Sequence, residues 1–251
     1  PTNDAFDSFL TSINASSLED VPVDVLTNVL LNHVISGEVQ SGSLTNGYAN
    51  TQAISSASQT NMSIYINTDN GVSFNGVSSV TTADVIASNG VVHIVDGVIG
   101  LPSVVTFALA DPNFDILVQA LTREDLTQDF VGLLNIPSGS SPSPFTVFAP
   151  VNSAFENLLS ELGLSSLNDI DEPTLSAVLA YHVIAGANQL SINLSDGMEF
   201  STAGGGNLTF NVGDNGQGIL TDNNDRTSNI ILVDVQADNG IIHAIDTVVL
   251  P

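Results

Sequence analysis

The chain has 251 residues, of which 43% are hydrophobic, so it is long enough to form one large or two ordinary globular domains with buried cores. Its 27 acidic residues face only two basic ones, Arg123 and Arg226, and the net charge of −25 argues against nucleic acid or an anionic membrane surface as a partner. The absence of cysteine excludes a disulfide framework, a thiolate metal site and a cysteine nucleophile, and no apolar run approaches the roughly 20 residues of a membrane span.

The first part of the chain predicts two helices. Apolar residues follow helical spacing over 6–13, and we expect Asn3, after a proline, to cap this helix at its N-terminus. The same pattern follows Pro150, where Asn152 is the expected cap. A second helical pattern starts at Leu26. It ends in an extended His-Val-Ile segment, which Gly37 is expected to stop.

A run of strands follows these helices. Residues 62–66 and 72–74 alternate in the manner of half-buried strands. Residues 84–96 then indicate two strands joined by a tight turn at Asn89-Gly90, because Asn-Gly supplies the positive φ angles that such hairpins demand.

The middle of the chain predicts further helices and one strand. A helix is expected over 104–121 and a second over 126–134. Serine, proline and glycine at 137–144 indicate a turn, and residues 145–148 indicate a short strand.

The remaining sequence repeats what came before. Three blocks recur in the same order at an offset of 149 or 150 residues, which indicates that one folding unit occurs twice. The paired blocks are Pro1–Phe6 with Pro150–Phe155, Leu26–Gly37 with Leu175–Gly186, and Asp84–Asp96 with Asp234–Asp246.

The repeat predicts two α+β domains, each with helices packed on a mainly antiparallel β-core, over residues 1–102 and 103–251. The first domain has no counterpart of the helices and strand expected over 104–148. We expect the resulting gap to be filled either by sequence upstream of Pro1 or by a neighbouring molecule that inserts a helix and a strand.

Three segments of the second domain resemble the fasciclin-like domain family. Phe145–Phe155 is similar to the first conserved box of the family, the pair Tyr181-His182 to its central Tyr-His pair, and Asn239–Leu250 to its closing box. The first domain carries the closing box and half of the first box, and its central pair is Asn32-His33.

This resemblance implies wedge-shaped modules of cell adhesion, matrix attachment or surface assembly that are not enzymes as a rule. In animal members of the family, receptor binding is placed near the Tyr-His region. The resemblance therefore carries Tyr181 and His182 over as candidate ligand-binding residues, although both also have a structural explanation.

The repeated histidines and aspartates have structural interpretations that we favour over chemistry. The four histidines lie beside Val/Ile runs without metal-ligand spacing, where a ring nitrogen can satisfy a buried backbone carbonyl. The repeated aspartates flank strands and turns, where a carboxylate caps a turn or accepts backbone N–H bonds. The histidines are His33, His93, His182 and His243, and the aspartates are Asp84, Asp96, Asp234 and Asp246.

Other sites of chemistry find little support in the sequence. Asp222, Asp225 and Asp214 could collect oxygen ligands for Ca²⁺, but they do not match an EF-hand, and a solvated loop is the favoured interpretation. Gly204–Gly206 lacks the lysine of a phosphate loop and indicates a turn. No cofactor, metal or catalytic group is expected.

The leading hypothesis is a non-catalytic adhesion or matrix protein located outside the cell or at its surface. Its partner would be a cell-surface, matrix or polysaccharide ligand, or copies of itself. The alternative is a surface protein that binds a polysaccharide or small molecule, with or without hydrolytic activity. A pocket that gathers two carboxylates would favour this alternative.

Overall fold

The computed structural model describes residues 1–251 and divides into two compact units. The N-terminal unit comprises residues 1–55 and 59–102, and the C-terminal unit comprises residues 56–58 and 103–251. Both are α+β, with mainly antiparallel sheets, which confirms the predicted fold class.

The N-terminal unit opens with two short helices. Helix α1 spans Asn3–Ser12 and α2 spans Val23–Leu31, with single 3-10 turns at Leu18–Asp20 and Ser41–Ser43. The prediction that Asn3 caps α1 is wrong. The Thr2 hydroxyl is the cap and accepts a hydrogen bond from the N–H of Ala5 at 3.2 Å, because Asn3 already lies inside the helix.

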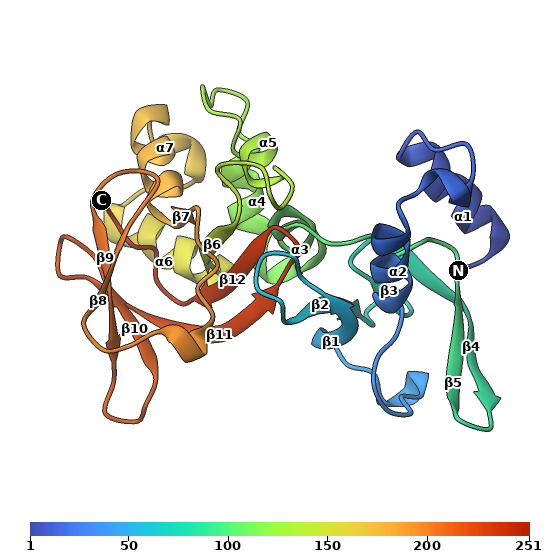
Figure 1. The fold of residues 1–251 in the computed structure, drawn as a ribbon. Helices are drawn as coiled ribbons and strands as arrows, with labels where there is room; N and C mark the ends of the chain where they lie inside the picture. Colours follow the sequence, from blue (N-terminus) through green and yellow to red (C-terminus); the bar gives the residue numbers. More distant parts are fainter. The chain divides into compact units, whose positions relative to one another are not determined.

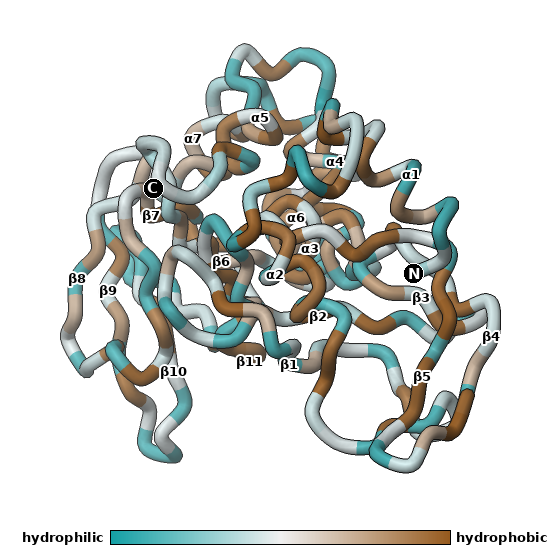
Figure 2. Tube along the Cα trace, turned by 45° about the vertical axis from the view of Figure 1, so that its right-hand side comes forward, coloured by the Kyte–Doolittle hydropathy of each residue, from teal (hydrophilic) through white to brown (hydrophobic).

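One five-stranded antiparallel sheet completes this unit (Figure 1). Its order is β1-β2-β3-β4-β5, so β5 is an edge strand. Figure 2 shows β5 as a mainly hydrophobic strand, which is unusual for an edge. The strands are β1 Gly47–Ile54, β2 Asn61–Asn67, β3 Ser73–Phe74, β4 Ser78–Ala87 and β5 Gly90–Val95.

The core of this unit lies on one side of the sheet. It is built from five buried side chains, with Ile35 and Leu44 half-buried against them. Strand β2 is more buried than its alternating pattern predicted, with five consecutive residues inside. The five buried core residues are Ile64, Ile66, Phe74, Val95 and Ile99.

The C-terminal unit begins with a group of short helices. Helix α3 covers Val104–Ala110, α4 covers Asp115–Leu121 and α5 covers Phe130–Leu134. The single helix predicted over 104–121 is wrong, because Asp111-Pro112 interrupts it and a 3-10 turn follows. The helix predicted from Leu126 starts later, at Phe130, where Asp129 caps it.

Two longer helices follow. Helix α6 spans Asn152–Leu162 and α7 spans Glu172–Tyr181. Asn152 is not the predicted N-cap of α6. Its side chain accepts the N–H of Ile116 at 2.9 Å and donates to the carbonyl of Pro112 at 2.8 Å, so it ties α6 to the start of α4.

No single helix is long and apolar enough to cross a membrane. Only α3 taken together with residues 112–121, which lie at 95° to it, meets the requirement, and it does so on length and composition alone.

The sheet of the C-terminal unit has seven strands in the order β7-β6-β12-β11-β10-β9-β8 (Figure 1). Strand β6 runs parallel to β12 and antiparallel to β7, so both of its edges are hydrogen-bonded, and all six of its residues are buried. The strands are β6 Phe145–Pro150, β7 Val183–Ala185, β8 Met198–Ser201, β9 Asn207–Val212, β10 Gly218–Thr221, β11 Thr227–Gln236 and β12 Gly240–Ile245.

The two Asn-Gly turns form hairpins, but not for the predicted reason. Neither asparagine nor glycine has a positive φ angle in either turn. The glycine of the C-terminal turn is required by a neighbour instead, because a Cβ on Gly240 would lie 2.4 Å from the carbonyl oxygen of Phe145.

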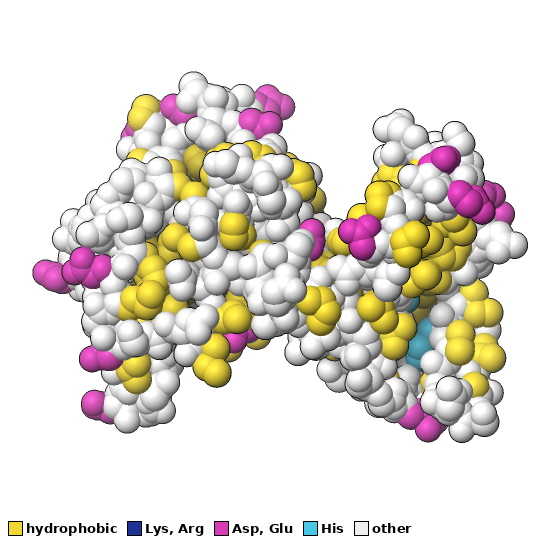
Figure 3. All heavy atoms as spheres, in the orientation of Figure 1, with side chains coloured by type: hydrophobic (Ala, Val, Ile, Leu, Met, Phe, Trp, Pro, Cys, Tyr) yellow, Lys and Arg dark blue, Asp and Glu magenta, His cyan; other side chains and the backbone are white.

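Both arginines are used inside the C-terminal unit. Arg123 donates to the carbonyls of Leu167 and Ile170 at 2.8 and 2.7 Å and pairs with Asp125. Arg226 pairs with Glu161 through both terminal nitrogens. No Lys or Arg atoms are visible on the face drawn in Figure 3, whereas acidic side chains are spread across it. The charged groups left free on the surface are therefore acidic.

Candidate functional site

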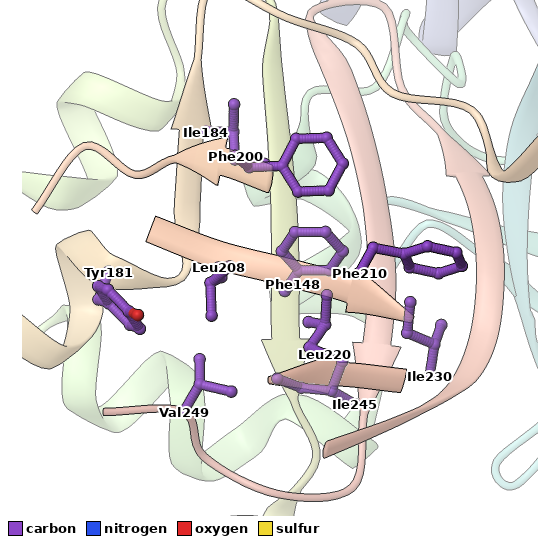
Figure 4. Packing of buried hydrophobic residues seen from close by; sticks show 10 residues of the cluster. All are labelled: Phe148, Tyr181, Ile184, Phe200, Leu208, Phe210, Leu220, Ile230, Ile245 and Val249. Atoms are coloured by element: carbon purple, nitrogen blue, oxygen red, sulfur yellow. The ribbon is translucent and has the colours of Figure 1, made fainter. Parts of the chain in front are cut away.

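The predicted Tyr181-His182 pair lies where α7 ends and β7 begins. Tyr181 is fully buried, at one end of the core cluster that Figure 4 shows beside Leu208 and Val249. Its hydroxyl donates to the carbonyl of Asn207 and accepts the N–H of Asn223 at 3.3 Å. Burial raises the pKa of this phenol above its usual value of 10.

His182 connects two parts of the backbone. Its Nδ1 donates to the carbonyl of Val178 at 2.7 Å, and its Nε2 accepts the N–H of Val249 at 3.3 Å, which fixes a neutral ring with the proton on Nδ1. Burial lowers the pKa of His182 from 6.5 to about 4. At neutral pH this histidine is an uncharged connector between α7 and the end of the chain.

The predicted turn at Gly204–Gly206 packs against Tyr181. A Cβ on Gly204 would lie 2.8 Å from the backbone nitrogen of Tyr181. A Cβ on Gly206, whose φ is +80°, would lie 2.6 Å from the side-chain nitrogen of Asn223 and 3.2 Å from the ring of Tyr181. The glycines are required by this close approach and by the left-handed backbone, since neither tolerates a side chain.

The N-terminal unit replaces Tyr181 by Asn32 and keeps a polar connection. The buried Asn32 amide donates to the carbonyls of Ile99 and Gly100 at 3.2 and 2.9 Å and accepts the hydroxyl of Thr51 at 3.0 Å. His33 beside it repeats the bonds of His182, from Nδ1 to the carbonyl of Val29 and from the N–H of Ile99 to Nε2. The sequence repeat alone shows that the tyrosine is replaced, but it does not show these hydrogen bonds.

The other repeated polar residues also hold backbone. His93 and His243 bond the carbonyls of Val39 and Gln189 at 2.9 and 2.8 Å, so all four histidines satisfy carbonyls as predicted. The carboxylate of Asp84 accepts both the N–H and the hydroxyl of Ser41, and Asp234 does the same with Ser191. Asp96 and Asp246 accept the N–H groups of Ser79 and Asn229.

The three candidate calcium ligands are not grouped for an ion. The buried Asp222 carboxylate is used by three backbone N–H groups, those of Asn224, Arg226 and Leu250, at 2.8 to 3.0 Å. No three His, Cys, Asp or Glu side chains of the chain, Asp214 and Asp225 included, are arranged to hold a metal ion. The expectation of no metal remains a prediction.

One open pocket of the C-terminal unit does gather two acidic residues. Asp111 and Glu156 both line a cavity of about 460 Å³ between α6 and β11. The Asp111 carboxylate accepts the backbone N–H and the side-chain amide of Asn113 at 3.0 and 2.9 Å.

The chain belongs to the fasciclin domain family. The family matches residues 1–102 and 112–251, so it covers both units. A solved FAS1 domain pair from the insect cell adhesion molecule fasciclin I aligns with all of this chain and 87% of that one, with a TM-score of 0.58. At 21% identity this likeness shows a shared fold.

Several curated proteins are similar in sequence. The uncharacterized protein sll1735 of Synechocystis is 35% identical over 154 residues, which are 60% of this chain and 98% of that protein. Human periostin is 29% identical over 254 residues, and pig transforming growth factor-beta-induced protein ig-h3 is 28% identical over 255. The chain spans only 28% of periostin and 34% of ig-h3.

Proposed function

We propose that this chain is a non-catalytic adhesion or matrix-assembly protein that acts outside the cell or at its surface. The observation that carries this proposal is the tandem arrangement of two fasciclin domains, which it shares with a domain pair from an insect cell adhesion molecule. Adhesion through repeated modules gains strength because linked sites bind together more tightly than either does alone.

The surface charge limits the classes of partner that this chain can bind. Since both arginines are paired inside the C-terminal unit, the accessible charged groups are carboxylates. Such a surface repels polyanions at low salt and favours a neutral polysaccharide, a basic protein surface or neutral patches on copies of the same chain.

Tyr181 and His182 support the proposal indirectly. Both side chains are buried and hydrogen-bonded to backbone, so a ligand would reach them only if α7 and β7 opened. We therefore place the adhesive contact on exposed residues that this connection holds in position, with Tyr181 and His182 as the support of that surface.

The alternative of a polysaccharide-binding protein with hydrolytic activity is favoured by the pocket of Asp111 and Glu156. Glycoside hydrolysis needs a carboxylic acid with a raised pKa beside an ionised one. The Asp111 carboxylate already accepts two hydrogen bonds from Asn113, so this function is the second candidate.

Deletion of the gene in the source organism tests the proposal. We expect the deleted strain to lose surface attachment or cell aggregation, and the protein to fractionate with the cell surface or the medium. Unchanged attachment together with a location inside the cell would contradict it.

A further inference from the structure

A cavity of the C-terminal unit lies between its first helices and its sheet. Helices α3, α4 and α5 line one side of this cavity, and β6, β7, β12 and the end of α7 line the other. Its volume is about 40 Å³, which is room for roughly one group the size of a water molecule or a methyl.

The lining of this cavity offers almost no polar partner to a ligand. All of its side chains are hydrocarbon except those of Thr122 and His182. The Thr122 hydroxyl donates to the carbonyl of Val118 at 2.8 Å, and both ring nitrogens of His182 are bonded to backbone groups. A water molecule inside would find at most the lone pairs of Thr122, whereas a buried water needs roughly three polar partners. The cavity therefore favours an apolar occupant.

The mouth of the cavity is also apolar. Leu109 on α3 is 63% exposed, and three further lining residues are half-buried. At the inner end, Phe148, which Figure 4 shows in the core of this unit, is fully buried. A continuous hydrocarbon path thus runs from solvent to the core. The half-buried residues are Val118, Leu121 and Val131.

Helix α3 has an apolar face that its neighbours do not cover. Thr106 is the only polar residue of this helix. A helix that is apolar almost all round is normally buried on every side. Because residues 112–121 lie at 95° to α3, the two segments cross rather than run side by side, and Leu109 remains exposed at the mouth. An apolar chain lying over Leu109 would remove this face from water.

No charged group is available at the mouth to hold an ionic ligand. No lysine, arginine, aspartate or glutamate lines the cavity. Arg123 follows Thr122 in the sequence, but its guanidinium is already bonded to Asp125 and to two backbone carbonyls. The net charge of −25 also repels an anion. A ligand that fits these features has an apolar chain and an uncharged head.

We infer that the C-terminal unit binds a single unbranched hydrocarbon chain with a neutral head, of the fatty-alcohol class. The terminal methyl occupies the cavity beside Phe148, the following methylenes lie against Leu109 and Leu121, and the head stays in solvent. The chain is unbranched because the cavity has room for about one methyl-sized group. This binding site is additional to an adhesive surface and does not depend on adhesion.

The test is titration of the purified 251-residue chain with 1-hexanol, 1-octanol and 1-decanol, followed by methyl NMR and thermal unfolding. We expect saturable binding that shifts the methyl signals of Val105, Leu109 and Leu121 and raises the melting temperature. Because each methylene removed from water contributes a similar free energy, the dissociation constant should fall about three- to fourfold per added methylene. Sodium decanoate at low salt should bind at least about tenfold more weakly than 1-decanol, since its carboxylate meets a chain of charge −25.

Val105→Ile is the variant that fills the cavity. Val105 lines the cavity and is 8% exposed, and isoleucine adds a single methylene, which matches the space. The free variant should keep or raise its melting temperature. It should bind 1-decanol at least about tenfold more weakly than the unaltered chain.

Leu109→Ser is the variant that alters the mouth. Because Leu109 is largely exposed, the core should remain intact, and binding of 1-decanol should weaken by at least about threefold. Leu162→Ser is the matched control, since Leu162 is 52% exposed at the end of α6 and lies outside the lining. It should leave binding unchanged.

Several results would overturn the inference. They are no saturable binding of any of the alcohols, no dependence of affinity on chain length, binding by Val105→Ile or Leu109→Ser equal to that of the unaltered chain, and decanoate binding as tight as that of 1-decanol. Cosedimentation with neutral phosphatidylcholine vesicles, without saturable binding of free 1-decanol, would make a bilayer the source of the hydrocarbon and would also contradict it.

Discussion

Gly240 and Phe145 lie so close that a Cβ on the glycine would come within 2.4 Å of the phenylalanine carbonyl. Gly240→Ala should therefore destabilise the C-terminal unit by about 1 to 3 kcal/mol, because β6 and β12 would have to separate. Gly90→Ala at the equivalent position should be neutral or stabilising by up to about 1 kcal/mol. Urea unfolding fitted with separate transitions for the two units measures the change in unfolding free energy for each variant. Equal losses at the two positions would contradict the close contact of Gly240 with Phe145 as the reason for its glycine.

The pH dependence of stability follows from His182. Its pKa of about 4 in the native state lies below the ordinary histidine pKa of 6.5 that applies in the unfolded chain, so the native state favours the neutral ring. The stabilisation that His182 gives the native state through this shift is fully present above pH 6.5. It is lost as the pH falls toward 4, by about 3 kcal/mol in all.

His182→Leu is the variant that checks this assignment. It should cost about 1 to 3 kcal/mol at pH 7, because the carbonyl of Val178 and the N–H of Val249 lose their partner, and it should flatten the acid slope of the C-terminal unit. Part of the slope will remain, since burial also lowers the pKa of His243. Thermal melts between pH 4 and 7 give the comparison, and an unchanged slope would exclude His182 as the group that titrates.

The sequence predicts much of this fold, and the reasons for its errors are local. The repeat identified both units and the role of the histidines, since a His in a Val/Ile run has few uses other than satisfying a carbonyl. It could not locate the contacts of Asn152, whose partners lie 36 and 40 residues away in the chain. For the same reason it assigned the glycine of the Asn-Gly turns to turn geometry rather than to the distant Phe145.

The candidate site was predicted less well than the fold. The residue pair Tyr181-His182 was identified by resemblance, but nothing local shows that the tyrosine hydroxyl is consumed by Asn207 and Asn223. Likewise, the substitution by Asn32 hid a polar connection that needs Thr51 and Ile99, both remote in sequence.

Arg123 should contribute strongly to the stability of the C-terminal unit. Its side chain is 10% exposed and holds the carbonyls of Leu167 and Ile170, which lie in the connection between α6 and α7. Arg123→Ala should destabilise the C-terminal unit by about 2 kcal/mol, because two carbonyls lose a charged donor. Arg123→Lys should restore little of this, since a lysine cannot serve both carbonyls and Asp125 in the same geometry. If Arg123→Lys were as stable as the unaltered chain in thermal or urea unfolding, the positive charge alone would explain the role of Arg123, and the two carbonyl hydrogen bonds would not.

Salt should raise the melting temperature of the whole chain. With a net charge of −25 and both arginines already paired, added NaCl screens the repulsion among surface carboxylates. Calcium should act through the same general effect, since the carboxylate of Asp222 is already bonded to three backbone groups. A melting shift at micromolar Ca²⁺ that neither Mg²⁺ nor NaCl reproduces would establish a specific ion site.

The most direct test of non-catalytic adhesion is complementation of the deleted strain with a chain that carries Asp111→Asn and Glu156→Gln. These changes keep the size of both side chains and the hydrogen bonds to Asn113 while removing the two carboxylates of the pocket. We predict that this variant restores surface attachment as fully as the unaltered chain does. A variant that folds and reaches the surface but fails to restore attachment would contradict the account and favour chemistry in the pocket.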